Sequence, residues 1–184
     1  MLAVLMADKL NIYLIGPMGS GKTAVGRQLA RELGLQFFDT DAEIEKRTGV
    51  DIPYIFEKEG EARFRERETE MLEELAAMDR IVIATGGGAC LSKTNRATLA
   101  ATGIVVFLKT NVDEQLKRTM RTRNRPLLMT GNPREVLENL SAERTAYYEE
   151  VADICLDTSG RRVKSVATAL RKLVAEHSPS ALQK

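Results

Sequence analysis

The stretch Gly16-Pro17-Met18-Gly19-Ser20-Gly21-Lys22-Thr23 has the spacing G-x-x-x-x-G-K-[ST], which is the strongest indication of fold in the chain. Its glycines let backbone N–H groups turn inward around a chain of phosphates. Its lysine supplies a positive charge to the β- and γ-phosphates, and its threonine supplies a hydroxyl to Mg²⁺. A helix that begins directly after it points the positive end of its dipole at the same phosphates. The stretch therefore predicts a site for a nucleoside triphosphate and its magnesium ion.

On both sides of this loop, short apolar runs alternate with helical patterns. The apolar runs, which we interpret as strands, cover residues 10–15, 35–38, 81–84, 104–108 and 154–156. Apolar residues recur at helical spacing over residues 23–33 and again after residue 162. Short apolar strands that alternate with helices are typical of a parallel sheet covered on both faces. The pattern predicts an α/β protein, with three α/β/α layers around a five-stranded parallel sheet of the P-loop NTPase type.

Two segments interrupt this alternation. Residues 41–78 are highly charged and mostly helical in pattern, and residues 121–134 are rich in arginine and contain Pro126, Gly131 and Pro133. Composition alone favours a solvated helical hairpin and a surface loop, whereas the phosphate loop favours a substrate-binding insertion and a lid. We expect a single domain over residues 1–184, divided into a core (9–40, 79–120 and 135–176), the insertion (41–78) and the lid (121–134).

The composition argues against several classes of protein. The 27 basic and 26 acidic residues leave a net charge of +1, so no overall field attracts nucleic acid or an anionic membrane. No apolar run approaches the roughly 18 residues of a membrane span, and the first six residues lack the charged start of a secretion signal. Cys90 and Cys155 lie in or beside apolar runs, which indicates core positions. We therefore expect a cytoplasmic monomer without nucleic-acid or membrane partners.

Asp39 and Asp41 follow the second predicted strand, and they are the candidate carboxylates of the site. P-loop proteins usually place an acid after a later buried strand, yet here strand 81–84 is followed by Thr85-Gly86-Gly87-Gly88-Ala89. Residues two apart in an extended segment point to one side, so Asp39 could address the metal and Asp41 a substrate hydroxyl. Thr40 and Glu43 have the spacing of a capping box, which predicts a helix from Asp41. The alternative is that both aspartates serve only the local structure.

Beyond the phosphate loop, an ordered set of short motifs resembles the shikimate kinase family from about residue 10 to residue 171. Its members are Asp39 and Asp41, Phe64-Arg65, Gly86-Gly87-Gly88, Arg125-Pro126-Leu127-Leu128, and Arg144 followed by Tyr147. Only the phosphate loop is specific by itself, whereas the shared order and spacing of the set are specific together. The resemblance implies transfer of the γ-phosphoryl group of ATP to the 3-hydroxyl of shikimate, with Mg²⁺, in chorismate and aromatic amino-acid biosynthesis. Shikimate is a cyclohexene carboxylate with three hydroxyls.

The resemblance also implies roles for individual residues. The implied catalytic residues are Lys22, Asp41 and Arg125. The implied ATP-binding residues are Gly19, Ser20, Gly21, Lys22, Thr23, Ala24, Arg118, Arg125 and Arg162. The implied shikimate-binding residues are Asp41, Arg65, Gly87, Gly88 and Arg144, and the implied Mg²⁺ ligands are Thr23 and Asp39. A planar guanidinium suits the carboxylate because it can bind both oxygens, and the three glycines allow the backbone to approach a ligand closely.

The residues alone leave two other functions open. A gluconate or nucleoside monophosphate kinase would share the architecture, but a nucleobase site needs side chains that read a base. The charged insertion with Arg65 instead favours a small anionic acceptor. A nucleotide-dependent switch or binding module would share the phosphate loop, and it would hydrolyse ATP slowly whatever metabolite is added. Release of ADP across a panel of hydroxy acids distinguishes these functions.

Overall fold

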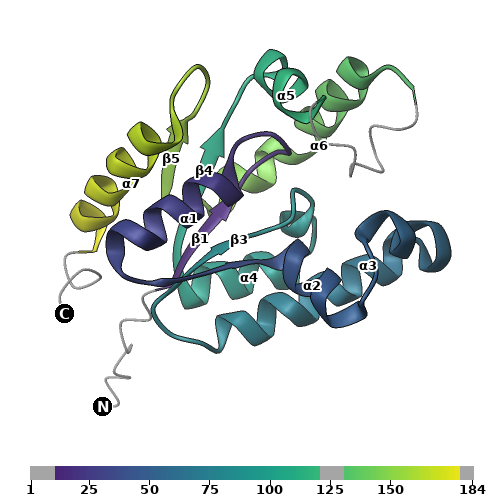
Figure 1. Cartoon of the computed structure of the whole chain (residues 1–184), viewed down its shortest axis with the longest axis horizontal. Helices are drawn as coiled ribbons and strands as arrows, with labels where there is room; N and C mark the ends of the chain where they lie inside the picture. Colours follow the sequence, from purple (N-terminus) through teal and green to yellow (C-terminus); the bar gives the residue numbers. More distant parts are fainter. Residues whose placement is uncertain (1–10, 121–130, 179–184) are drawn as a thin grey trace.

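A five-stranded parallel sheet forms the middle layer of the structure, a computed structural model that describes residues 11–120 and 131–178 (Figure 1). The strands are β1 (Asn11–Ile15), β2 (Gln36–Asp39), β3 (Ile81–Ala84), β4 (Gly103–Lys109) and β5 (Ile154–Asp157). They lie in the order β2-β3-β1-β4-β5, and each pairing is parallel. The strand that leads into the phosphate loop is therefore central. This arrangement confirms the predicted fold class.

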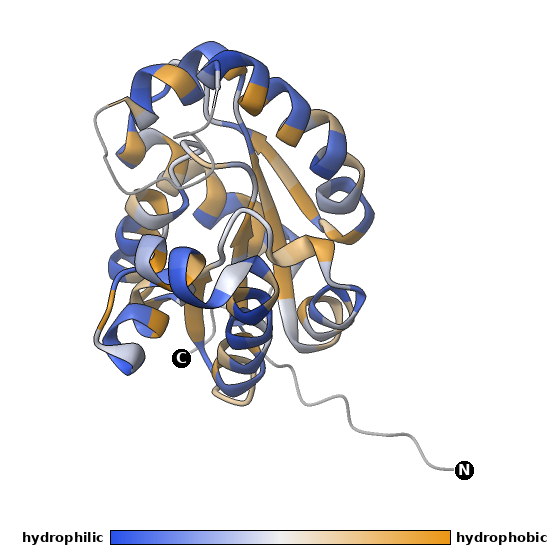
Figure 2. Ribbon diagram, turned by 90° about the vertical axis from the view of Figure 1, so that its right-hand side faces the viewer, coloured by the Kyte–Doolittle hydropathy of each residue, from blue (hydrophilic) through white to orange (hydrophobic). Residues whose placement is uncertain are grey.

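Helices cover both faces of the sheet, and the alternation of side chains along the strands explains why. On β1, Tyr13 and Ile15 face one apolar cluster, whereas Ile12 and Leu14 face the other. One cluster lies under α1 (Lys22–Leu33) and α7 (Val163–His177). The other lies largely under α3 (Ile52–Ala76), α4 (Lys93–Thr102) and α6 (Pro133–Val151). Figure 2 shows the hydrophobic strands between helices whose outer faces are hydrophilic. The remaining helices are α2 (Thr40–Thr48) and α5 (Val112–Thr119), with a 3₁₀ turn η1 (Ala89–Leu91).

The predicted insertion consists of α2 and α3, which lie on the opposite side of the molecule from α7 (Figure 1). The long helix α3 bends at Gly60, where φ is 83° and ψ is 167°. Helix α2 begins at Thr40 rather than at Asp41, so the predicted capping box is wrong. The Asp39 side chain caps this helix instead, because its Oδ1 accepts hydrogen bonds from the N–H groups of Asp41 and Ala42.

Three other expectations about position need correction. Strand β2 begins at Gln36 rather than at Leu35, since the Leu35 N–H donates to the Ala30 carbonyl and so completes the end of α1. Helix α6 begins at Pro133, inside the predicted lid, after the cap Asn132. Cys155 is exposed on the edge strand β5, whereas Cys90 is buried as expected.

Residues 121–130, which form most of the predicted lid and include Arg125, lie outside the described residues. Within the two described ranges, no helix has the length and apolar character that crossing a membrane requires. The architecture therefore places the phosphate loop at the centre of one sheet edge, with the insertion beside it.

Candidate active site

The phosphate loop connects β1 to α1, and its backbone conformation depends on glycine. Gly21 caps α1 with a φ of 95°, a left-handed conformation that side chains with a Cβ rarely adopt. Lys22 is the first residue of α1 and is largely buried, and its Nζ donates to the carbonyls of Gly16 (2.7 Å) and Pro17 (2.8 Å). Its charge therefore lies inside the loop. Ala24 is exposed on the first turn of the same helix.

Two residues from other elements brace this loop. The Arg118 guanidinium, on α5, donates to the carbonyls of Gly19 (3.0 Å) and Thr158 (3.0 Å). The buried Thr158 hydroxyl donates to the Ser20 carbonyl (2.9 Å). Sequence reasoning assigned Arg118 to the nucleotide and overlooked Thr158, whose hydrogen bonds link the end of β5 to the loop. Both contacts tie the loop to the carboxyl edge of the sheet.

A hollow of about 290 Å³ opens beside the braced loop, and it is lined by Glu114, Lys117, Arg118, Gly160, Arg161 and Arg162. It is the position at which the sequence predicts the edge of a nucleotide base. Arg162 lies there exposed, and within the described parts of the chain its side chain makes no hydrogen bond. The side of the site expected to hold the nucleotide base thus carries positive charge, from the fixed Arg118 and from the exposed Arg162.

Thr23 and Asp39 form a pair of oxygen donors at the start of α1. The Thr23 hydroxyl donates to Asp39 Oδ2 at 2.6 Å, while the other carboxylate oxygen caps α2. Mg²⁺ prefers oxygen ligands and commonly binds one or two protein groups together with phosphates and waters. These two residues fit that requirement beside the phosphate loop. Over the described residues, no cluster of three or more His, Cys, Asp or Glu side chains could hold a metal alone, so phosphate oxygens would complete the shell.

A cavity of about 310 Å³ lies between the phosphate loop, the insertion, the turn of three glycines after β3 (residues 86–88, the glycine turn), and α6. It brings together all of the residues that the sequence assigned to metal and substrate. These residues are Thr23, Asp39, Asp41, Arg65, Gly87, Gly88 and Arg144. Four elements that are distant in sequence therefore meet around one space that contains both carboxylates and guanidinium groups, Arg27 of α1 among them.

Arg65, the arginine of the insertion that lines the cavity, is held by two glutamates of its own helix. Arg65 Nη1 donates to Glu68 Oε2 (2.7 Å), and its Nη2 donates to Glu61 Oε1 (2.8 Å). Glu68 is only 1% exposed, and burial raises its pKa although the charges of Arg65 and Arg144 oppose the shift. Its Oε1 has no hydrogen-bond partner among the described residues. Sequence reasoning missed Glu68, and the only signal was its place three residues after Arg65.

The glycines of this turn are needed for a reason other than the approach of a ligand that the sequence suggests. A Cβ on Gly86 would overlap the Glu68 carboxylate, and a Cβ on Gly88 would overlap the Arg65 guanidinium. Only Gly87 has ordinary room, with its nearest neighbour at 3.5 Å from an added Cβ. Two of the three glycines therefore accommodate the ion pair between the half-buried Arg65 and the buried Glu68. The Gly86 N–H also donates to the Thr40 hydroxyl at 3.0 Å.

Helix α6 contributes Arg144 to the cavity, and its guanidinium is largely buried. The tyrosine that accompanies it is Tyr148, not Tyr147 as the motif suggested. Tyr147 is half-buried and stacks with Arg96, whose guanidinium carbon lies 4.6 Å from the ring centroid. Tyr148 is buried, and its hydroxyl donates to the Gly87 carbonyl. The residue one full turn after Arg144 thus reaches the glycine turn.

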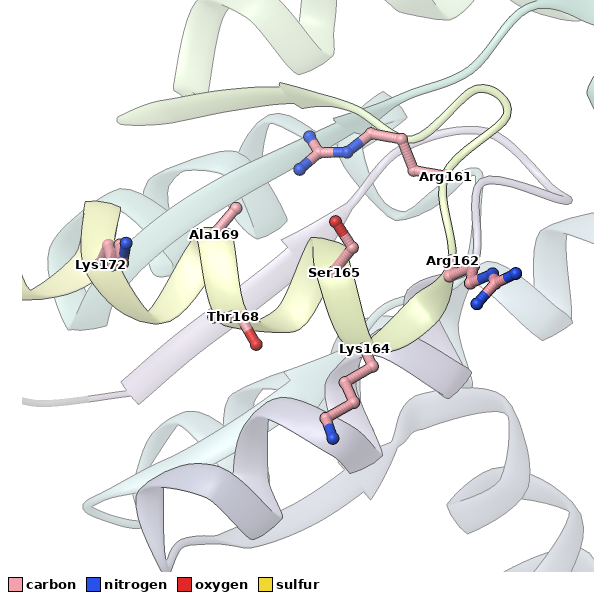
Figure 3. A pocket seen from close by; sticks show the side chains of 7 residues that line it. All are labelled: Arg161, Arg162, Lys164, Ser165, Thr168, Ala169 and Lys172. Atoms are coloured by element: carbon pink, nitrogen blue, oxygen red, sulfur yellow. The ribbon is translucent and has the colours of Figure 1, made fainter.

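A larger hollow of about 530 Å³ runs along the exposed face of α7 (Figure 3). Its cations include Arg161, Arg162 and Lys164, and the Arg161 and Ser165 side chains lean toward each other while Arg162 points away. No carboxylate and no residue of the phosphate loop lines it. It therefore lacks a carboxylate that could accept the proton of an attacking hydroxyl, so the 310 Å³ cavity is the better candidate for chemistry.

Comparison with known proteins agrees with this geometry. A family model described as shikimate kinase matches residues 18–175. A shikimate kinase of Actinobacillus pleuropneumoniae serotype 5b is 53% identical over 169 residues, which are 92% of this chain and 98% of that protein. One from Vibrio cholerae is 50% identical over 172 residues, 94% of this chain and 99% of its own.

Solved structures lead to the same family. Shikimate kinase from Acinetobacter baumannii in complex with shikimate has a TM-score of 0.89 and 49% identity, covering 91% of this chain and 94% of that one. A gluconokinase from Sinorhizobium meliloti, with a TM-score of 0.59, is only 15% identical and shares the fold alone. The chain belongs to the shikimate kinase family.

Proposed function

We propose that this protein transfers the γ-phosphoryl group of ATP to the 3-hydroxyl of shikimate, which gives shikimate 3-phosphate and ADP. One observation carries the proposal: a single cavity joins Thr23 and Asp39, beside the phosphate loop, to Asp41 and to the arginines Arg65 and Arg144. A switch protein needs no second set of anion-binding groups opposite its phosphates. A small acceptor with one carboxylate and several hydroxyls matches these groups.

On the nucleotide side, the residues of the chain serve mainly to position charge. The transition state of phosphoryl transfer is loose, so its stabilisation depends on placement and electrostatics. Lys22, together with the N–H groups of Gly19, Ser20 and Gly21, would bind the β- and γ-phosphates. Thr23 and Asp39 would hold Mg²⁺, which when bound neutralises charge on those phosphates. Ala24, Arg118 and Arg162 would contact the rest of the nucleotide.

On the acceptor side, the two arginines and Asp41 divide the work of recognition. Arg65 and Arg144 would bind the carboxylate of shikimate, because a guanidinium pairs with both carboxylate oxygens. The Gly87 and Gly88 N–H groups, which donate to no other group within the described residues, would bind further oxygens. Asp41 would orient the attacking hydroxyl toward the γ-phosphate and accept its proton.

Arg125 remains a proposal from the sequence, as it lies outside the described residues. It would close over the phosphates with the lid and stabilise charge on the transferring group. That the protein works in the cytoplasm as a monomer also stays a prediction. Light scattering of the purified protein, with and without MgATP, tests the monomer.

A coupled assay of ADP release tests the proposed function. ATP and Mg²⁺ are supplied with shikimate, gluconate, a nucleoside monophosphate or no acceptor, and the product is identified by mass spectrometry. We expect rapid release with shikimate and background release with the other three. Equal release under all four conditions would indicate a nucleotide switch, and stimulation by gluconate or the nucleotide would indicate the alternative kinases.

A further inference from the structure

Tyr148 is a buried residue that the mechanism above does not use, and its hydroxyl lies at the edge of the candidate site. The side chain is only 1% exposed and donates to the Gly87 carbonyl. Its ring packs against Phe107, with the centroids 5.0 Å apart. Burial raises the pKa of Tyr148 well above its usual value, and the nearby charge of Arg144 only partly opposes the shift. The hydroxyl therefore stays protonated and remains a hydrogen-bond donor.

The hydrogen bond from Tyr148 to the Gly87 carbonyl fixes the orientation of the whole peptide unit between Gly87 and Gly88. The Gly87 C=O and the Gly88 N–H belong to one planar peptide unit, and no peptide bond of the described residues is cis. In a trans unit the two groups point in opposite directions, so the direction of the carbonyl sets that of the N–H. Because neither flanking residue has a Cβ, this peptide plane could rotate more easily than most. A partner on the carbonyl side opposes that rotation.

The direction of the Gly88 N–H matters for binding, because Gly88 lines the cavity. Gly87 and Gly88 both line the cavity, and their N–H groups make no hydrogen bond within the described parts of the chain. Arg144 lines the same cavity one helical turn before Tyr148 on α6. A single helix therefore brings a guanidinium to the cavity and a hydroxyl to the turn that faces it.

We propose that Tyr148 is a positioning residue for the acceptor. It holds the Gly87–Gly88 peptide in the orientation that directs the Gly88 N–H toward the bound acid, and it prevents a peptide flip. The proposal rests on the proposed function, because the acceptor is the anion that this N–H would meet. The competing account is that Tyr148 only fills the core beside Phe107.

Tyr148→Phe separates the two accounts, because it retains the packed ring and removes only the hydroxyl. We expect it to raise KM for shikimate about 5- to 30-fold, from the loss of a hydrogen bond to a half-buried carbonyl. KM for MgATP should stay within about twofold of the wild-type value, since the phosphate loop is untouched. The thermal shift produced by shikimate, measured without turnover, should fall in parallel.

Two matched variants serve as controls. Tyr147→Phe removes the hydroxyl of the neighbouring residue, which makes no hydrogen bond within the described residues, and should change neither KM. Thr158→Val removes a buried hydroxyl that donates to the Ser20 carbonyl of the phosphate loop, and should raise KM for MgATP rather than for shikimate. If loss of the Tyr148 hydroxyl raises only KM for shikimate and loss of the Thr158 hydroxyl raises only KM for MgATP, each hydroxyl positions only the groups next to it.

Two results would overturn the inference while the proposed function stands. In the first, Tyr148→Phe leaves KM for shikimate at the wild-type value. In the second, it raises both KM values alike and lowers Tm, which is the behaviour of a core residue. If shikimate does not stimulate the wild-type protein at all, the proposed function and the inference both fail. An unchanged KM for MgATP in the variant shows that the fold is intact.

Discussion

Replacement of Arg144 by alanine gives the sharpest test of how the cavity recognises a carboxylate. Arg144 is the better of the two arginines for this purpose, because Arg65 neutralises the buried Glu68 and its removal would leave a buried charge without its partner. The Nε of Arg144 makes no hydrogen bond within the described residues, and its ion pair with the exposed Glu143 is long, at 3.6 Å. Arg144→Ala therefore removes this long pair and the interactions of Arg144 with Glu68 and the Tyr148 hydroxyl, but none of the short hydrogen bonds that hold Arg65 to Glu68 and Glu61.

The expected magnitude follows from the kind of bond that is lost. A hydrogen bond between charged groups contributes about 1.5–3 kcal/mol, which corresponds to roughly a 10- to 150-fold change in kcat/KM. Arg65 still faces the same carboxylate in the variant, so we expect a loss near the lower end of this range. KM for MgATP should be almost unchanged, because Arg144 contacts neither the phosphate loop nor the Thr23–Asp39 pair in any described hydrogen bond.

The assay compares shikimate with its methyl ester, which keeps the hydroxyls and loses the negative charge. Coupled ADP release gives kcat/KM for both acceptors in the wild type and in Arg144→Ala. The wild type should discriminate strongly against the ester, and the variant should discriminate less. The difference is a coupling energy, so it separates recognition of the charge from general damage to the site. Arg63→Ala is the matched control, because Arg63 is exposed and pairs with Glu66 outside the cavity.

An Arg144→Ala variant that rejects the ester as strongly as the wild type does would refute this reasoning. The arginine would then act through the structure of α6 rather than through the carboxylate. The shikimate assignment would lose its main physical support, although the kinase assignment, which depends on the phosphate loop, would remain.

Three further predictions concern single groups. Glu61→Gln should lower KM for shikimate about 1.5- to 5-fold, because it removes an exposed carboxylate that competes with the substrate for Arg65. Steady-state kinetics measure the change, with Glu66→Gln, which lies outside the cavity, as the control, and a raised KM would contradict the prediction. Lys22→Met should lower kcat about 100-fold or more while Tm holds, and a variant that keeps over about a tenth of wild-type turnover would contradict the phosphate-loop assignment. Burial raises the pKa of Cys90 to about 12, so at pH 8 only Cys155 should react with a thiol reagent in the folded protein, and both should react after denaturation; two reactive thiols in the native state would show that Cys90 is accessible.

The parts of the fold that depend on local sequence could be predicted well. The phosphate loop and the apolar strands depend on spacing within a few residues, and the sequence therefore gives the order of elements and the layers. The pair Asp39 and Asp41 could also be placed at the site, since parallel strands end at one edge of the sheet. The residue that caps α2 could not be predicted, because Asp39 and Thr40 are both good helix caps. The Gly86 N–H decides between them by engaging the Thr40 hydroxyl.

The missed residues depend on tertiary packing, which spacing does not reveal. Glu68 lies in a helix crowded with glutamates, and nothing in its immediate sequence distinguishes the one buried carboxylate from its exposed neighbours. Tyr147 and Tyr148 are adjacent, so a motif read with an error of one residue selects the wrong ring. Only the packing of α6 against β4, where Tyr148 meets Phe107, determines which ring turns inward.

The glycine turn contacts each of these missed residues, Glu68 and Tyr148, and so connects the helices that carry them. Its first N–H binds the Thr40 hydroxyl at the start of α2, and its middle carbonyl binds Tyr148 of α6. The spaces left by absent Cβ atoms hold Glu68 and Arg65 of α3. Three helices that each supply a group to the cavity are thus adjusted to the same few backbone atoms, which the core strand β3 holds in place. The turn therefore acts as the common reference for the acceptor side, and its glycines are required mainly by the side chains that surround them.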